Sequence, residues 1–160
     1  EVTDAPVESR EETSKYTDVL DNGIARKWTW AMDAKSVVTS PSPQSPITHG
    51  TGPLVISGLA WTGRGTITRV DVSKDGGKTW ETARLAKEGE KMALTRFYLD
   101  TEWDGSEMML QSRAMDDTGY IQPSKAQLRE VRGLNSIYHN NCIQTWLVRS
   151  NGEAENVEVS

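Results

Sequence analysis

The chain has 160 residues, 36% of them hydrophobic and 26% charged, which suits one globular domain with an extended tail. Its formal net charge of −5 gives no general attraction to nucleic acid or to an anionic membrane, so both are excluded as partners. No apolar run is long enough to cross a bilayer. With 13 Gly, 6 Trp, 4 Tyr and 1 Phe, the composition favours a loop-rich β domain over a helical bundle.

Residues that commonly bind metals are few. Cys142 is the single cysteine, so no disulfide can form within the chain, and its place before a strand is typical of a small buried thiol. His49 and His139 are too scattered for a recognisable metal motif, and we interpret them as turn or surface residues. The sequence therefore predicts no metal site.

Residues 1–33 are predicted to form an extended connector. The first 27 residues are charged and poor in apolar side chains, with one helical turn expected over residues 9–16. Trp28, Trp30 and Met32 then alternate with smaller residues, which predicts a short strand or an aromatic strap laid across a partner. Because the chain begins at Glu1 rather than Met, we expect a piece of a longer polypeptide.

The next part of the chain contains short apolar or alternating runs separated by glycine and proline turns. These runs predict strands over residues 36–39, 54–61, 67–73, 79–80, 94–99, 108–115 and 143–148. Such spacing is typical of an all-β, immunoglobulin-like antiparallel sandwich, which we expect over residues 34–150. Residues 151–160 are then a C-terminal tail, and helix is expected in less than a tenth of the chain.

Alternation along two of these strands predicts which faces are buried. Four side chains are expected to point into the core: Val70, Val72, Met108 and Leu110. Met109 and Met115 fall on the opposite face, where they are exposed or lie at an interface. Ile67 is out of phase, which predicts either a bulge near Thr68 or an outward-facing Ile67.

A hairpin is predicted over residues 73–80, SKDGGKTW. Gly76 and Gly77 can take positive φ, Asp75 can accept backbone hydrogen bonds, and Trp80 can cover the end of the core. Two families carry a similar motif. The Asp-box of sialidase-like propellers repeats at each blade, whereas no second copy exists here, so that interpretation is disfavoured.

The other family is supported by further segments in the same order and spacing. Residues 58–61, 69–73, 75–80, 112–114 and 116–123 together resemble the C-terminal dimerisation domain of the sulfite oxidase family of molybdenum enzymes. Three more segments are similar, more narrowly, to the molybdenum subunit of bacterial sulfane dehydrogenase, part of the thiosulfate-oxidising Sox system: residues 10–18, 25–44 and 131–141.

This resemblance implies a periplasmic parent enzyme whose larger N-terminal domain holds a molybdopterin cofactor with a cysteine thiolate on molybdenum. Cys142 does not match that ligand, so no cofactor and no catalytic residue are expected in this chain. The sandwich is expected to form a homodimer and to contact the molybdopterin domain of the same parent. The further partners implied are a cytochrome c subunit as electron acceptor and a sulfur-carrier protein as substrate.

Arg132 matches the arginine that this family's sandwich contributes to the anionic substrate pocket. A guanidinium stays charged and offers a planar fork of donors to oxyanions, and Gly133 beside it lets the backbone approach a ligand. The alternative is that Arg132 only pairs with an acidic group of the protein. Lys125, Arg129 and His139 are secondary candidates for the mouth of the same pocket.

A rival function comes from another class. A stand-alone immunoglobulin-like recognition module could use Trp28, Trp30 and Trp61 as a stacking platform for a glycan or a protein partner. Such a module has no need to dimerise, so the oligomeric state separates the two hypotheses.

Overall fold

The computed structural model describes residues 2–5, 7, 9–19, 22, 26–87, 89–134 and 139–159, with the backbone alone for residues 12, 15, 19 and 26–28. Part of the predicted connector, the Trp28 side chain and residues 135–138 of the sulfane dehydrogenase-like segment therefore lie outside the description.

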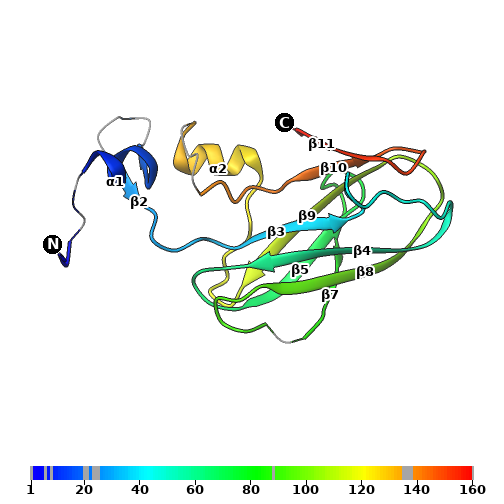
Figure 1. Ribbon diagram of the computed structural model, residues 1–160, viewed down its shortest axis with the longest axis horizontal. Helices are drawn as coiled ribbons and strands as arrows, with labels where there is room; N and C mark the ends of the chain where they lie inside the picture. The colour runs from blue at the N-terminus through cyan, green and yellow to red at the C-terminus, as the bar shows by residue number, and fades with distance from the viewer. Residues whose placement is uncertain are drawn as a thin grey trace.

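Two antiparallel sheets pack face to face (Figure 1). One sheet has the strand order β11-β10-β9-β5-β6 and the other the order β3-β4-β8-β7. The bounds are β3 (Lys35–Ser40), β4 (Gly52–Trp61), β5 (Ile67–Ser73), β6 (Glu81–Thr82), β7 (Arg84–Leu85), β8 (Thr95–Trp103), β9 (Met108–Asp116), β10 (Thr145–Val148) and β11 (Ala154–Val157). The predicted all-β sandwich is confirmed.

The core lies between the two sheets, as the alternation predicted. Val70, Val72, Met108 and Leu110 are all buried, with Val70 and Leu110 at 0% exposure. Such burial contributes about 1.5–3 kcal/mol for each large apolar side chain. Close packing within the four-stranded sheet depends on Gly58, because a Cβ there would lie 2.3 Å from the Phe97 ring on β8 and 2.2 Å from the Val37 carbonyl oxygen on β3.

The phase break at Ile67 is a β-bulge. Ile67 pairs with Asp116 and Arg69 with Met115, so Thr68 is the extra residue on β5. The bulge turns Ile67 into the core, where it is 2% exposed. Of the two predicted alternatives, the bulge near Thr68 is correct and the outward-facing Ile67 is wrong.

Several strand ends differ from the prediction, and three of them have a clear structural cause. The strand expected at residues 79–80 begins at Glu81, because Thr79 and Trp80 complete the preceding turn, and it is followed by β7 in the other sheet. The strand expected at residue 143 begins at Thr145, since the Ile143 amide donates to the Pro123 carbonyl instead. The sheet also extends past residue 150, because β11 pairs with β10.

The largest feature missing from the prediction is helix α2 (Lys125–Arg132). Ser124 accepts from the Gln127 amide while the Gln127 side chain accepts from the Ser124 amide, a reciprocal capping box. Gly133 ends the helix with φ 74°. The sequence contained these signals, but the strand pattern on both sides drew the interpretation away from helix.

The N-terminal segment contains α1 (Arg10–Lys15), which matches the expected helical turn, and a small sheet of β1 (Thr17–Val19) and β2 (Arg26–Trp28). Helices α1 and α2 hold six and eight residues, so described helix stays below a tenth of the chain. These elements lie together at one end of the sandwich (Figure 1). That end carries the arginine of interest.

Candidate functional site

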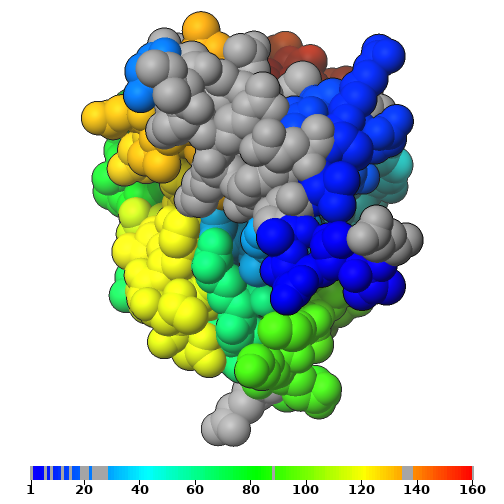
Figure 2. Space-filling model, turned by 90° about the vertical axis from the view of Figure 1, so that its left-hand side faces the viewer, coloured from blue at the N-terminus to red at the C-terminus, as the bar shows by residue number. Residues whose placement is uncertain are grey.

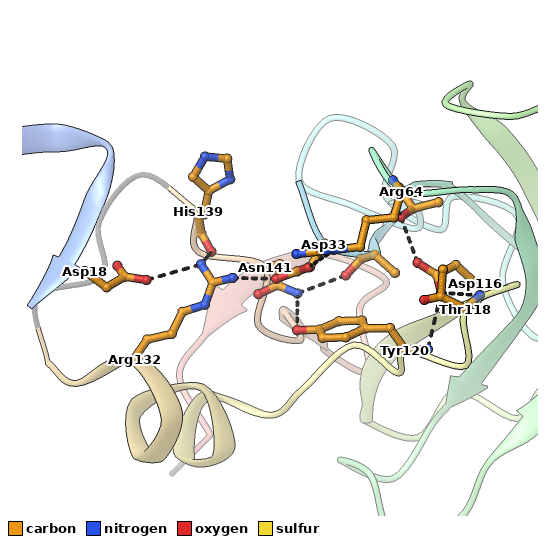
Figure 3. Close-up of polar contacts among 11 residues, drawn as sticks. Asp18, Asp33, Arg64, Asp116, Thr118, Tyr120, Arg132, His139 and Asn141 are labelled. Carbon is orange, nitrogen blue, oxygen red and sulfur yellow. Dashed lines mark hydrogen bonds and ion pairs between the residues drawn. The ribbon is translucent and has the colours of Figure 1, made fainter. Parts of the chain in front are cut away.

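Arg132 lies at the end of α2 and is buried, with 2% of its surface exposed. One guanidinium nitrogen, Nη2, donates to Asp33 Oδ2. The other, Nη1, donates to the His139 carbonyl at 3.3 Å and lies 3.6 Å from Asp18 Oδ2 (Figure 3). The arginine therefore joins the end of α2 and the loop after it to two N-terminal segments, β1 and the residues just before β3.

Asp33 bridges two arginines. Its Oδ1 accepts from Arg64 Nε at 2.6 Å, and its Oδ2 accepts from Arg132. The side chains of Asp18, Asp33 and Arg132 are at most 6% exposed, whereas that of Arg64 is 43% exposed. Burying such charges is costly unless they are paired, and in this cluster the two carboxylates balance the two guanidinium groups. We call these four residues the Arg132 cluster.

An amide and a phenol complete the polar surroundings. Asn141 Nδ2 donates to the Ala34 carbonyl and to Tyr120 Oη, both at 3.1 Å. Burial raises the pKa of the Tyr120 phenol above its usual value, and the nearby Asp33 carboxylate raises it further. Burial lowers the pKa of the His139 imidazole, and Arg132 adds to this effect. Both side chains are thus held toward their neutral forms.

The loop before α2 positions Tyr120. Asp116 Oδ1 accepts from the Thr118 hydroxyl and from the amides of Thr118 and Tyr120, while its Oδ2 accepts from Thr62. Burial opposes ionisation of Asp116, but the hydrogen bonds from Thr118 and Thr62 outweigh it and lower its pKa. An ionised carboxylate therefore ties the loop to the β4–β5 connection, as Figure 3 shows.

A groove of about 530 Å³ runs beside the Arg132 cluster. Arg132, Asp33 and Tyr120 supply polar atoms to its wall, and Ile121, Leu128 and Val131 supply apolar surface. Apolar walls strengthen the interaction of a cation with an anion, because water screens it less. The arrangement suits an anionic group held by Arg132, provided that group can exchange with one of the two carboxylates.

The three secondary candidates are placed differently. His139 meets the Arg132 cluster through its carbonyl oxygen. Lys125 and Arg129 instead lie near Glu158 at the C-terminus: Lys125 donates to its carboxylate, and Arg129 is 3.9 Å away. The structure therefore brings His139 to Arg132 and leaves Lys125 and Arg129 with another partner. Asp18, Asp33 and Asn141 were not among the predicted residues, because no local pattern marks a buried polar group whose partner is so distant in sequence.

In the hairpin of residues 73–80, the side-chain hydrogen bonds of Asp75 stay within the turn, while the backbone at Lys74 and Gly76 pairs with Met109. The Asp75 carboxylate accepts from Ser73 Oγ, from the amides of Lys78 and Thr79, and from Thr79 Oγ1. The hydrogen bonds from Thr79 contribute most to a pKa well below the usual Asp value. Trp80 Nε1 donates to the Gly77 carbonyl at 3.0 Å. All these partners lie within the turn, so its polar groups shape the backbone and do not form a reaction centre.

On the outer face of the five-stranded sheet, Trp80 stacks against Arg113. The Arg113 guanidinium lies over the Trp80 ring, 4.2 Å from its centroid, and its Nη2 is 3.1 Å from Asp71 Oδ2. The other oxygen of Asp71 accepts from Arg69 Nε at 2.7 Å. This face therefore presents a flat aromatic and cationic surface with one buried counter-charge.

The described residues do not fit a molybdenum centre. Within the described ranges, no three or more His, Cys, Asp or Glu side chains gather in a way that could hold a metal ion. The Cys142 thiol is buried, and its Sγ accepts from Gln144 Nε2 at 3.5 Å.

In the described part of the chain, no helix is both long enough and apolar enough to cross a membrane.

The tryptophan platform of the rival hypothesis is only partly described. Trp30 is exposed on the N-terminal segment, and Trp61 is half-buried at the end of β4. The side chain of Trp28 lies outside the described atoms. Two of the three proposed tryptophans therefore have described positions.

Comparison with known families identifies the sandwich. Residues 26–146 match the family described as the Mo-co oxidoreductase dimerisation domain. The chain belongs to this family. The matched range runs from β2 into β10 and includes Trp28, Trp30, helix α2 and Arg132.

Similar proteins agree with the family assignment. Sulfite oxidase of Gallus gallus is 35% identical over 118 residues, which cover 68% of this chain and 25% of that protein. Mitochondrial sulfite oxidase of Rattus norvegicus is 33% identical over 121 residues, covering 69% and 21%. The crystal structure of the sulfane dehydrogenase SoxCD from Paracoccus pantotrophus matches 98% of this chain and 40% of its own chain, with 69% identity and a TM-score of 0.92. The chain thus spans less than half the length of each of these relatives.

Proposed function

We propose that this dimerisation domain pairs two subunits of a molybdenum oxidoreductase of the sulfane dehydrogenase type and supplies Arg132 to the pocket for its anionic sulfur substrate. The observation that carries the proposal is the 69% identity to SoxCD over nearly the whole chain, at a TM-score of 0.92. A cytochrome c subunit as electron acceptor, a sulfur-carrier protein as substrate and a periplasmic location belong to the same proposal.

The pairing surface in this proposal is the outer face of the five-stranded sheet. Met109 and Met115 are half-buried on that face of β9, where the alternation places them opposite the core. Arg113 stacks on Trp80 beside them. Tryptophan and arginine are the residues most enriched at the energetic centres of protein interfaces, and methionine adapts well to a facing surface.

A second surface is proposed for the molybdopterin domain of the parent. The end of the sandwich near Arg132 carries large, exposed apolar side chains: Trp30, Met32, Ile121, Val131 and Leu134. In Figure 2, the N-terminal elements (blue), the loop before α2 (yellow) and α2 (orange) share this face of the molecule. Exposed apolar groups gathered on one face are typical of a contact surface. Docking there would bring the catalytic domain to the groove beside Arg132.

Sedimentation tests whether the domain pairs two subunits. At tens of micromolar, we expect the chain to sediment as a two-fold dimer, the commonest closed symmetry of soluble oligomers, with more than about 1,000 Å² buried in total. A chain that remains monomeric, both alone and joined to its molybdopterin domain, would contradict the proposal and favour the recognition-module alternative.

A further inference from the structure

We infer that Asp18 is an internal stand-in for an anionic ligand of Arg132. In the free chain its carboxylate faces the guanidinium, and it gives way when a small oxyanion of the sulfate or thiosulfate type binds there. This inference deepens the proposed function, because it rests on Arg132 being an anion-binding residue. It adds a displaceable group that controls access to that residue.

The two carboxylates of the Arg132 cluster are held very differently. Both oxygens of Asp33 accept hydrogen bonds from guanidinium groups, one from Arg64 and one from Arg132. Asp18 Oδ2, by contrast, lies 3.6 Å from Arg132 Nη1 and has no hydrogen-bond partner among the described residues. Hydrogen bonds between ionised groups are strongest at about 2.7–2.9 Å. Asp18 is therefore the weaker of the two partners and the one that a ligand would replace.

The backbones that carry the two acids differ in the same way. Asp33 follows Met32, whose carbonyl accepts from the Gly63 amide, and precedes Ala34, which is fully buried in the core. Asp18 lies on β1, a three-residue strand that pairs with β2 and with neither large sheet. An isolated pair of short strands is only marginally stable. Asp18 can therefore leave the cluster without breaking a hydrogen bond of the sandwich.

Charge explains why an anion would replace it. When Asp18 withdraws, Asp33 alone faces Arg64 and Arg132, so the described cluster has a net charge of +1. A buried excess of positive charge is unfavourable, because one carboxylate then serves two guanidinium groups, and the planar fork of Arg132 matches the oxygens of a small oxyanion. The neighbouring His139 and Ala34 carbonyls already accept hydrogen bonds, from Arg132 and Asn141 respectively. The Arg64 side chain, which is 43% exposed, offers a second cation near solvent.

Anion titrations of the 160-residue chain test the inference. Sulfate and thiosulfate would be titrated into the wild type and Asp18→Asn at constant ionic strength, set with sodium chloride, and binding followed by calorimetry and by the melting temperature. We expect Asp18→Asn to bind both anions at least about tenfold more tightly than the wild type, and ligand binding to raise its melting temperature in a saturable way. Asp100→Asn, which removes the same charge from an exposed site on β8, should behave as the wild type.

A second measurement does not depend on the variant. Saturating sulfate should increase amide hydrogen exchange of the wild type at residues 17–19 and leave β9 unchanged, because Asp18 releases β1. Equal anion affinity in the wild type and Asp18→Asn would overturn the inference. So would tighter binding that persists in Asp18→Asn combined with Arg132→Met, which removes both the charge and the donors, since the anion would then lie elsewhere. Failure of the proposed function would instead appear as absent pairing or as unchanged turnover of Arg132 variants in the parent enzyme.

Discussion

The hairpin of residues 73–80 and the Arg132 cluster both place an aspartate among several donors, but the partners differ in how far apart they lie along the sequence. Every hydrogen bond of the Asp75 carboxylate comes from within four residues along the chain. Arg132 reaches Asp33, 99 residues away, and also contacts β1. Local partners form as soon as the turn forms, whereas the cluster requires the complete fold. The turn is therefore a local structural element. In the cluster, by contrast, moving one segment changes the contacts of the others.

Arg132→Met should have the largest effect on stability. Methionine keeps much of the stem but leaves Asp33 with Arg64 as its remaining described guanidinium partner and leaves the buried Asp18 with none among the described residues. Breaking a buried ion pair in this way costs about 3–5 kcal/mol, to be measured by urea denaturation. The matched control is Arg149→Met, which removes exposed ion pairs to Glu107 and Glu155 and should cost less than about 1 kcal/mol. Equal losses of unfolding free energy in the two variants would show that the buried ion pairs of Arg132 stabilise the fold no more than the exposed ion pairs of Arg149.

Arg113→Ala should weaken pairing of the chain. If the outer face of the five-stranded sheet is the interface, losing the guanidinium stacked on Trp80 should cost about 2 kcal/mol, or roughly a 30-fold higher dimer dissociation constant. Sedimentation equilibrium would measure it. Arg84→Ala removes a similar stack, on Tyr98 of the other sheet, and should leave pairing unchanged. A reversed pattern would move the interface to the four-stranded sheet.

Asp75→Asn should give the smallest effect, confined to acid pH. Because hydrogen bonding lowers the folded-state pKa of Asp75, its contribution is fully present above the unfolded-state Asp pKa and is lost as pH falls through the folded-state value. Melting temperatures measured from neutral to acid pH should therefore fall less steeply in Asp75→Asn than in the wild type. Parallel curves would show that the turn gains nothing from the charge.

The sequence predicted the parts of the fold that depend on neighbours. Alternation along β5 and β9 identified the buried faces, and the phase break at Ile67 located the bulge. Helix α2 was missed because its eight residues lie between strand-like runs, although Ser124 and Gln127 form its cap. The acidic partners of Arg132 could not be predicted, because burial of Asp18 and Asp33 depends on how three distant segments meet. For the same reason, sequence left open whether Arg132 pairs with protein carboxylates or with a ligand.

The most direct test of the central claim is the activity of Arg132→Lys in the intact molybdenum enzyme. Lysine keeps the positive charge that Asp18 and Asp33 require but loses the planar fork that matches an oxyanion. With molybdenum fully loaded and dimerisation intact, kcat/KM for the anionic sulfur substrate should fall by about 10- to 100-fold, while Arg149→Lys stays at the wild-type value. An unchanged kcat/KM in Arg132→Lys would show that the arginine only pairs with its carboxylates and does not serve the substrate.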